Sequence, residues 1–372
     1  MADTPIVVRA SREQYLATVT GYSKQWAYGL SAADYTKREA EVISSLPFSS
    51  EMQCWVLVPS SSPTTSTSIL SSLELRPVPI LVSSAGQQAR SELALVVNKL
   101  YTPDQHRKKG YAKLLLEHVH RVARSMRGDG GKGGVVMSFL HSDVGDFYKR
   151  FGWYIPKSST NFDTTWTVEE LSPSMKNTSS TNLRPLALSD LRLLLPLDTS
   201  LISSFLSTPS PHSIRLAIEP TFASHESSIT RALFDMNLLR PTLSPPKVWG
   251  FESSVRESPN WAFLTFTLDL PRSILRILRF RPPSSSSPED STIVEALIRA
   301  TVQVARECGL ENVVAWNMDQ GILGRISEEW RGETGERELP LAALAWYGEG
   351  DGLVKEKGEG IELEFNEAFG SY

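Results

Sequence analysis

A basic turn between two apolar segments is the part of this sequence best suited to chemistry. Residues 100–116 read LYTPDQHRKKGYAKLLL, so Pro103 ends a strand-like run and Gly110 directly precedes a helix-like one. The first N–H groups of a helix are unpaired and lie at the positive end of its dipole, so such a turn can bind an anion. Gly110 and Ala112 leave room for close approach to the main chain. The pattern predicts a pyrophosphate site, and a solvated basic helix start is the alternative interpretation.

The distribution of charge favours an anionic ligand at this turn. Between Lys99 and Arg127 the sequence has eight Lys or Arg and two acids, a local charge of +6, whereas the whole chain carries -4. Residues 327–372 contain twelve acids and four bases, a local charge of -8. This acidic stretch could attract a cationic amine, or it could be a solvated acidic surface.

The elements that position the turn follow a strand, turn, helix, strand order. Apolar residues over 92–102 predict a strand that ends at the proline, and apolar positions at helical spacing predict a helix over 111–126. The helix face is expected to contain Leu114, Leu115, Val119 and Val122. The other elements predicted in this half are a helix over 30–45 that starts at Ser31, strands at 54–59, 78–84 and 135–142, a glycine-rich turn at 128–134, a short helix at 143–150, and a closing strand at 164–170.

A second motif follows the next strand. Residues 142–153 read SDVGDFYKRFGW, which gives the pattern F-Y-x-R-x-G-W after a strand, as R-x-x-G-x-A follows the strand before it. The pair, in this order, resembles the GNAT superfamily of acetyl-CoA-dependent N-acetyltransferases. The LSAADYTKRE segment, LHSDVG and FYKRFGW are also similar to the fungal lysine N-acetyltransferase-like family. The resemblance covers the first half of the chain and implies an α+β fold, with a mixed, mostly antiparallel sheet and flanking helices.

The resemblance also implies roles for individual residues, with acetyl-CoA as the cofactor. Tyr148 takes the place of the tyrosine that protonates the departing thiolate, and an aromatic side chain packed beside Phe147 and Phe151 is the alternative. The residues implied in cofactor binding are Leu100, Tyr101, Thr102, His106, Arg107, Lys108, Lys109, Gly110, Tyr111, Ala112 and Lys113. The residues expected near the acceptor amine are Asn98, Ser142, Asp143, Glu364 and Glu367.

The general base is not assigned by the sequence. An amine of pKa ~10.4 must lose a proton before it attacks, and many GNAT enzymes use a glutamate on the fourth strand. Here that place falls near Val96, with Asn98 as the nearest polar residue. The candidates are Glu92, His141, Asp143 or a carboxylate of the second domain. Two further histidines, His118 and His120, are expected at the surface or at a helix cap rather than as ligands or bases, and no metal-ligand spacing is present.

The second half predicts a degenerate copy of the same fold. Strands are indicated at 247–253, 261–270, 274–281, 312–317, 341–348 and 360–365, with a helix at 292–308. Where a phosphate turn would lie, the sequence is RPPSSSSPED, so this copy is not expected to bind CoA. The predicted boundaries are a catalytic domain over 1–171, a polar linker over 172–182, and a domain over 183–372 that shapes the acceptor site.

Composition excludes several classes of protein. A hydrophobic content of 41% and a charged content of 22% indicate a soluble globular protein, and a pI of 6.0 argues against a general nucleic-acid coat. Two distant cysteines and the lack of a long apolar run indicate the cytosol or the nucleus, with no membrane partner; the oligomeric state is not indicated.

We expect acetyl transfer to the side-chain amine of free L-lysine. The alternatives are a polyamine, another small amine or a protein lysine as acceptor, or a non-catalytic CoA-binding protein.

Overall fold

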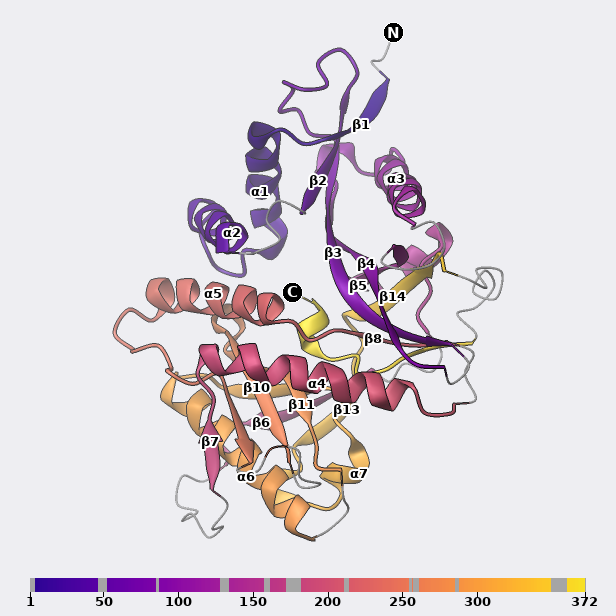
Figure 1. Cartoon of the computed structure of the whole chain (residues 1–372). Coiled ribbons are helices and arrows are strands. Elements are labelled where there is room, and N and C mark those ends of the chain that lie inside the picture. Colours follow the sequence, from indigo (N-terminus) through magenta and orange to yellow (C-terminus); the bar gives the residue numbers. More distant parts are fainter. Residues whose placement is uncertain are drawn as a thin grey trace. The chain divides into compact units, whose positions relative to one another are not determined.

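The structure is a computed structural model of the 372-residue chain. It describes residues 4–45, 52–84, 87–127, 134–156, 161–171, 182–210, 214–253, 256, 261–284, 288–348 and 360–371. The chain forms two compact units, each assembled from separate stretches of sequence (Figure 1). Unit 1 comprises residues 1–159, 200–219 and 338–364, and unit 2 comprises 160–199, 220–337 and 365–372. Apart from Asn182, the linker predicted at 172–182 lies outside the described residues.

Unit 1 is built on a mostly antiparallel sheet that has eight strands within the described residues. Its strands, in spatial order, are β1 (Pro5–Arg9), β2 (Gln53–Pro59), β3 (Ser71–Ser84), β4 (Arg90–Tyr101), β5 (Val135–Ser142) and β14 (Leu341–Trp346), while β8 (Ile214–Ile218) pairs with β3 and β15 (Ile361–Leu363) pairs with β8. Only the β4–β5 and β8–β15 pairs are parallel among them. The accompanying helices are α1 (Arg12–Trp26), α2 (Ala32–Ser45), α3 (Tyr111–Ser125) and the 3-10 helices η1 (Asp104–His106) and η2 (Gly145–Phe151).

Local sequence explains where these helices begin and which face they bury. Ser31, the predicted helix start, accepts a hydrogen bond from the N–H of Asp34 over 3.1 Å, which caps α2. The buried face of α3 includes Leu115 and Val119 as predicted, whereas Leu114 is exposed. Burial of one such leucine contributes about 1.5–3 kcal/mol, so this face holds α3 against the sheet.

Unit 2 also contains a mixed, mostly antiparallel sheet, seven-stranded within the described residues. The strand order is β13 (Glu333–Glu336), β6 (Phe162–Thr167), β12 (Asn312–Trp316), β11 (Ile274–Arg281), β10 (Phe263–Asp269), β9 (Gly250–Ser253) and β7 (Leu183–Pro185). The helices are α5 (Phe222–Leu239), α6 (Pro288–Glu307), α7 (Gln320–Leu323), η3 (Leu188–Asp190), η4 (Leu270–Arg272), η5 (Glu328–Trp330) and η6 (Ala368–Ser371), and α4 (Leu191–Leu206) starts in unit 2 and ends in unit 1. The predicted α+β class is confirmed, and no described helix could cross a bilayer.

Three predicted strands, β6, β14 and β15, lie in the other sheet from the one that the sequence suggests. The strand expected to close the first sheet is β6, which pairs antiparallel with β12 of unit 2. Its Trp166 is buried there and donates a hydrogen bond from Nε1 to the carbonyl of Trp330 over 2.8 Å. Conversely, β14 pairs antiparallel with β5 (Figure 1). The register places Leu344 opposite Phe139. Because β5 is almost wholly buried, its edge needs a partner strand, and the sequence supplies that partner only near the C-terminus.

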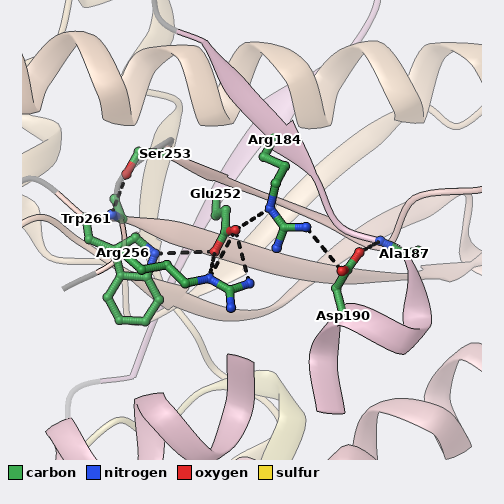
Figure 2. Close-up of polar contacts among 8 residues, drawn as sticks. Arg184, Ala187, Asp190, Glu252, Ser253, Arg256 and Trp261 are labelled. Atoms are coloured by element: carbon green, nitrogen blue, oxygen red, sulfur yellow. Dashed lines mark hydrogen bonds and ion pairs between the residues drawn. The ribbon is translucent and has the colours of Figure 1, made fainter. Parts of the chain in front are cut away.

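A cluster of charges at the β7–β9 edge of unit 2 is internally neutralised (Figure 2). The buried carboxylate of Glu252 accepts hydrogen bonds from the Nε atom of Arg256 over 3.1 Å and from Arg184. Arg184 also pairs with Asp190 over 3.1 Å, and Asp190 accepts the N–H of Ala187. Because each charge has a partner here, we infer that the cluster holds β7 against β9 at the edge of the sheet.

Candidate functional site

The strands that precede and follow α3 diverge at one end. Pairing between β4 and β5 stops at Val96 and Phe139, although β4 continues to Tyr101 and β5 to Ser142. The pairing of β4 with β3 is irregular in the same region, and Lys99 has a φ of +51°. Such a bulge bends a strand away from its neighbour. The end of β4 therefore presents main-chain groups without a partner in β5, which is the arrangement that can receive an extended ligand as an added strand.

The basic turn opens directly onto α3, as the sequence predicts. Gly110 is the N-cap of α3 with a φ of +80°, and a Cβ atom built there would have no heavy atom within 4 Å. Within the described part of the chain, the N–H groups of residues 108–113 donate no hydrogen bond to another main-chain group. Lys108 and Lys109 are exposed and form no ion pair among these residues. Free donors, open space and positive charge together fit a pyrophosphate group.

The remaining residues predicted to bind the cofactor surround this turn. Arg107 braces the turn, because its Nε atom donates to the carbonyl of Thr102 over 3.1 Å and its Nη1 atom lies 3.0 Å from Asp104. Thr102 is held by a 2.8 Å hydrogen bond between its hydroxyl and that of Ser71. Leu100 and Tyr101 lie at the end of β4, His106 in η1, and Tyr111, Ala112 and Lys113 in the first turn of α3.

The side chain of Tyr101 contributes to the fold beside the turn. Its ring meets those of Tyr22 and Trp26 edge-on, at centroid distances of 6.0 and 6.2 Å. A Cβ atom at Gly21 would lie 3.1 Å from the Tyr101 ring, so the glycine lets α1 approach β4. The strand end that could receive the ligand is thereby anchored to α1.

Tyr148 lies in η2 and is partly buried there. Burial, together with the negative charge of Asp143, raises the pKa of Tyr148 to about 12, so the phenol is protonated at neutral pH. Its ring packs edge-on against Phe147, with centroids 5.2 Å apart, and its hydroxyl has no hydrogen bond within the described residues. Ser142 shapes the approach to η2 by donating from its hydroxyl to the carbonyl of Gly145 over 2.7 Å. The hydroxyl of Ser142 is thus directed into the turn.

Of the acceptor-side candidates, the two glutamates are held in different units. Glu364 of unit 1 accepts from the Nε atom of Arg215 over 3.0 Å, and Glu362 lies 3.4 Å from the same group. Glu367 of unit 2 accepts from Arg279 over 2.6 Å, and burial raises the pKa of Glu367 to about 7. Both carboxylates are therefore engaged with arginines, and this part of the acidic stretch is neutralised.

The candidate bases differ in their surroundings. Glu92 is buried and accepts from Arg90 over 2.8 Å. His141 is half-buried with its ring edge-on to Phe139, and Asp143 is exposed. The geometry singles out none of them as the base. Within the described residues, no group of three or more His, Cys, Asp or Glu side chains could hold a metal ion.

A buried ionic cluster on the α2, β3 and β4 elements is absent from the sequence-based prediction. The ammonium of Lys99 lies 2.6 Å from Glu39 and 3.3 Å from Glu74, which itself lies opposite Asn98 in the sheet. These charges hold the pKa of Lys99 well above its ordinary value. Lys99 therefore adds nothing to the exposed positive charge of the turn. Glu74 lies outside the strand predicted at 78–84, so nothing in the sequence indicated that it would face Lys99.

The histidines of α3 are half-buried and packed against other side chains, which differs from the expected surface or cap positions. His118 packs against Trp55, with ring centroids 4.2 Å apart. His120 forms hydrogen bonds through both ring nitrogens, to the hydroxyl of Tyr347 and to the carbonyl of Phe151. The expectation failed because Tyr347, which follows β14, could not be placed beside α3 from its sequence position.

Unit 2 also contains a parallel strand pair, β11 and β12, that diverges at one end. Residues near the C-terminus occupy the space between the diverging strand ends. The parallel pairing of β11 with β12 ends at Arg276. Beyond that point, the N–H of Phe280 donates to the carboxylate of Glu367 over 3.2 Å, and the side chain of Asn317 donates to the carbonyl of Asn366. The C-terminal segment thus bridges the ends of the two strands, where a ligand would otherwise lie.

A comparison with family models places the chain in a family through its second half. The family model described as "LYC1 GNAT-like C-terminal domain" matches residues 167–372. The chain is similar to a probable N-acyltransferase from Enterococcus faecalis (10% identity, TM-score 0.55, covering 95% of this chain and 74% of that one). It is also similar to GCN5-related N-acetyltransferases from Kribbella flavida (13%, 0.54, 92% and 71%) and Anabaena variabilis (13%, 0.54, 94% and 74%). No curated protein matches the chain. At these identities, the solved structures support the fold alone.

Proposed function

Because this chain belongs to the family of the LYC1 GNAT-like C-terminal domain, we propose that it transfers an acetyl group from acetyl-CoA to the side-chain amine of free L-lysine. The observation that carries the proposal is the divergence of β4 from β5 directly before the Gly110 turn. The choice of lysine rests on the similarity of the first half to the fungal lysine N-acetyltransferase-like family.

The residues of unit 1 fit this cofactor. The N–H groups of residues 108–113 would hold the pyrophosphate, with Lys108 and Lys109 supplying charge. The unpaired end of β4 would align the pantetheine arm. Acetyl-CoA, when bound, supplies an activated thioester.

Tyr148 would donate the proton that the departing sulfur requires. Its pKa of about 12 keeps the proton on Oη until negative charge develops nearby. A thiol has a pKa of ~8.5, so complete proton transfer from a phenol of pKa about 12 is uphill, and the phenol would stabilise the sulfur by donating a hydrogen bond as negative charge develops during carbon–sulfur cleavage. Tyr148 therefore acts in concert with departure of the thiolate.

The acceptor amine must arrive neutral or lose a proton in the site. At neutral pH a lysine amine of pKa ~10.4 is almost wholly protonated. Glu92, His141 and Asp143 are the residues to test as the proton acceptor. The conservative substitutions are Glu92→Gln, His141→Gln and Asp143→Asn.

An amine panel tests the proposal directly. The purified chain is incubated with acetyl-CoA and one amine at a time: L-lysine, a linear polyamine or a lysine-containing peptide. Release of free thiol is measured, and the masses of the products are determined by mass spectrometry. We expect thiol release and a mono-acetylated product with L-lysine. Turnover with the polyamine or the peptide alone would refute the lysine assignment. Binding of CoA by calorimetry without turnover of any amine would identify a non-catalytic CoA-binding protein instead.

A further inference from the structure

A chain of hydrogen bonds inside unit 1 ends on the 3-10 helix that carries Tyr148. The hydroxyl of Ser138 on β5 lies 2.6 Å from that of Tyr347, which follows β14. The hydroxyl of Tyr347 lies 2.8 Å from Nδ1 of His120 on α3. Nε2 of His120 lies 2.7 Å from the carbonyl oxygen of Phe151, the last residue of η2. Strand β5, helix α3, the 3-10 helix η2 and the residue that follows β14 are thus joined in one line of polar contacts.

The chemistry of its last member fixes the direction of the whole chain. A carbonyl oxygen only accepts, so Nε2 of His120 carries a proton, and in a neutral imidazole Nδ1 is then an acceptor. Tyr347 must then donate to Nδ1, and Ser138 must donate to Tyr347. Burial lowers the pKa of His120, consistent with a neutral ring; Arg124 and Glu117 of the same helix act on it in opposite directions. The structure thereby selects one tautomer of one neutral imidazole.

Close packing holds the imidazole against the end of η2. The ring of Trp153 stacks on His120, with centroids 4.1 Å apart and planes at 29°. Gly152, between Phe151 and Trp153, has a φ of +94°, and a Cβ atom there would lie 3.3 Å from Nε2 of His120. Glycine therefore allows both the backbone turn and the close approach of the ring.

The same turn is tied back to Tyr148. The N–H of Trp153 donates to the carbonyl of Tyr148 over 3.2 Å. The segment that His120 contacts is therefore hydrogen-bonded to Tyr148 itself. The other end of α3 begins at the Gly110 turn. One rigid helix thus connects the candidate phosphate site to the end of η2.

We propose that His120 and Tyr347 are positioning residues for Tyr148, holding η2 so that the phenol is aligned for proton donation. The inference rests on the proposed function, because it assumes that Tyr148 is the acid. Neither residue contacts the reacting atoms. A displacement of a reacting group by about 1 Å can lower the rate on the order of 100-fold. Contacts that only hold η2 in place can therefore affect turnover.

Nitrogen-15 NMR of ring-labelled histidine tests the chain independently of activity. At neutral pH we expect His120 to show a protonated Nε2 and a bare, hydrogen-bonded Nδ1, and Tyr347→Phe to shift the Nδ1 resonance. A protonated Nδ1, or an unchanged resonance in Tyr347→Phe, would overturn the proposed chain even if the enzyme is active.

Kinetics then separate positioning from general stability. We expect His120→Gln and Tyr347→Phe each to lower kcat about tenfold with little change in KM for acetyl-CoA, whereas His118→Gln on the same helix stays near wild type. In a Tyr148→Phe background, His120→Gln should have no further effect, because the group that it positions is gone. An equal loss in both backgrounds would refute the positioning role while leaving the acid role intact. If Tyr148→Phe alone is fully active, the acid assignment fails and the positioning inference fails with it.

Discussion

Replacement of Gly110 by alanine separates the cost of backbone strain from the cost of a blocked ligand site. Gly110 has a φ of +80°, where an L-residue is strained, yet its Cβ position has no neighbour within 4 Å. The variant therefore suffers strain without a clash in the protein. Left-handed backbone costs a non-glycine residue about 1–2 kcal/mol.

This strain sets the expected effect on stability. A loss of 1–2 kcal/mol in a unit of this size lowers the melting temperature by roughly 2–8 °C. The protein should remain folded, since the free energy of unfolding of a domain is typically about 5–15 kcal/mol. Scanning calorimetry measures this change directly.

The effect on the cofactor should be larger than the effect on stability. The added methyl group occupies the space through which a phosphate would approach the N–H groups of residues 108–113. A hydrogen bond to a charged group is worth about 1.5–3 kcal/mol, so loss of one weakens binding on the order of 10- to 100-fold. Isothermal titration with CoA measures the dissociation constant.

Gly29 provides the matched control. It also has a positive φ, +96°, and no heavy atom within 4 Å of its Cβ position, but it lies outside the basic turn. Gly29→Ala should lower the melting temperature similarly and leave CoA affinity unchanged. The assignment of the turn would be refuted by wild-type affinity in Gly110→Ala, or by an equal loss of affinity in Gly29→Ala.

Three further variants test the charges described above. Lys99→Met removes the ammonium shared by Glu39 and Glu74 and should cost about 3–5 kcal/mol in urea unfolding; a neutral effect would contradict burial of the cluster. Tyr148→Phe should lower kcat on the order of 100-fold, and because the pKa of Tyr148 is raised to about 12, the wild type should lose no activity through this group below pH 10. The raised pKa of Glu367 makes its stabilising contribution complete below pH 4.5 and lost as the pH rises through about 7. Glu367→Gln should therefore flatten the decline in melting temperature between pH 5 and 8, and an identical decline in the variant would disprove this reasoning.

The strand, turn and helix of the candidate site could be predicted because their signals are local. Pro103 ends β4, Gly110 starts α3, and the apolar positions of α3 repeat with helical spacing. Helices α4 and α5 lack such signals. Pro196 lies inside α4, and α5 buries polar residues such as His225 and Ser228, which breaks the contrast between its faces.

The contacts that complete the site depend on residues far away in the sequence. In the sequence Lys99 belongs to a basic segment, and only when α2 is folded over β4 does Glu39 become its partner. Tyr347 cannot be placed beside His120 until β14 is known to pair with β5. Sequence periodicity identifies elements, whereas the pairing of distant elements decides which side chains are buried together.

The pairing of β5 with β14 delays the completion of unit 1 while the chain is being synthesised. β5 ends at Ser142 and β14 begins at Leu341, so the ribosome must add the intervening residues before the edge of β5 can be covered. At ordinary rates of elongation this takes roughly 10–40 s. During that interval the nascent chain has an apolar, unpaired strand edge, which is the kind of surface that chaperones bind and that aggregates form from. Unit 1 would thus begin folding early and finish among the last parts of the chain, and a shortened version should retain β14.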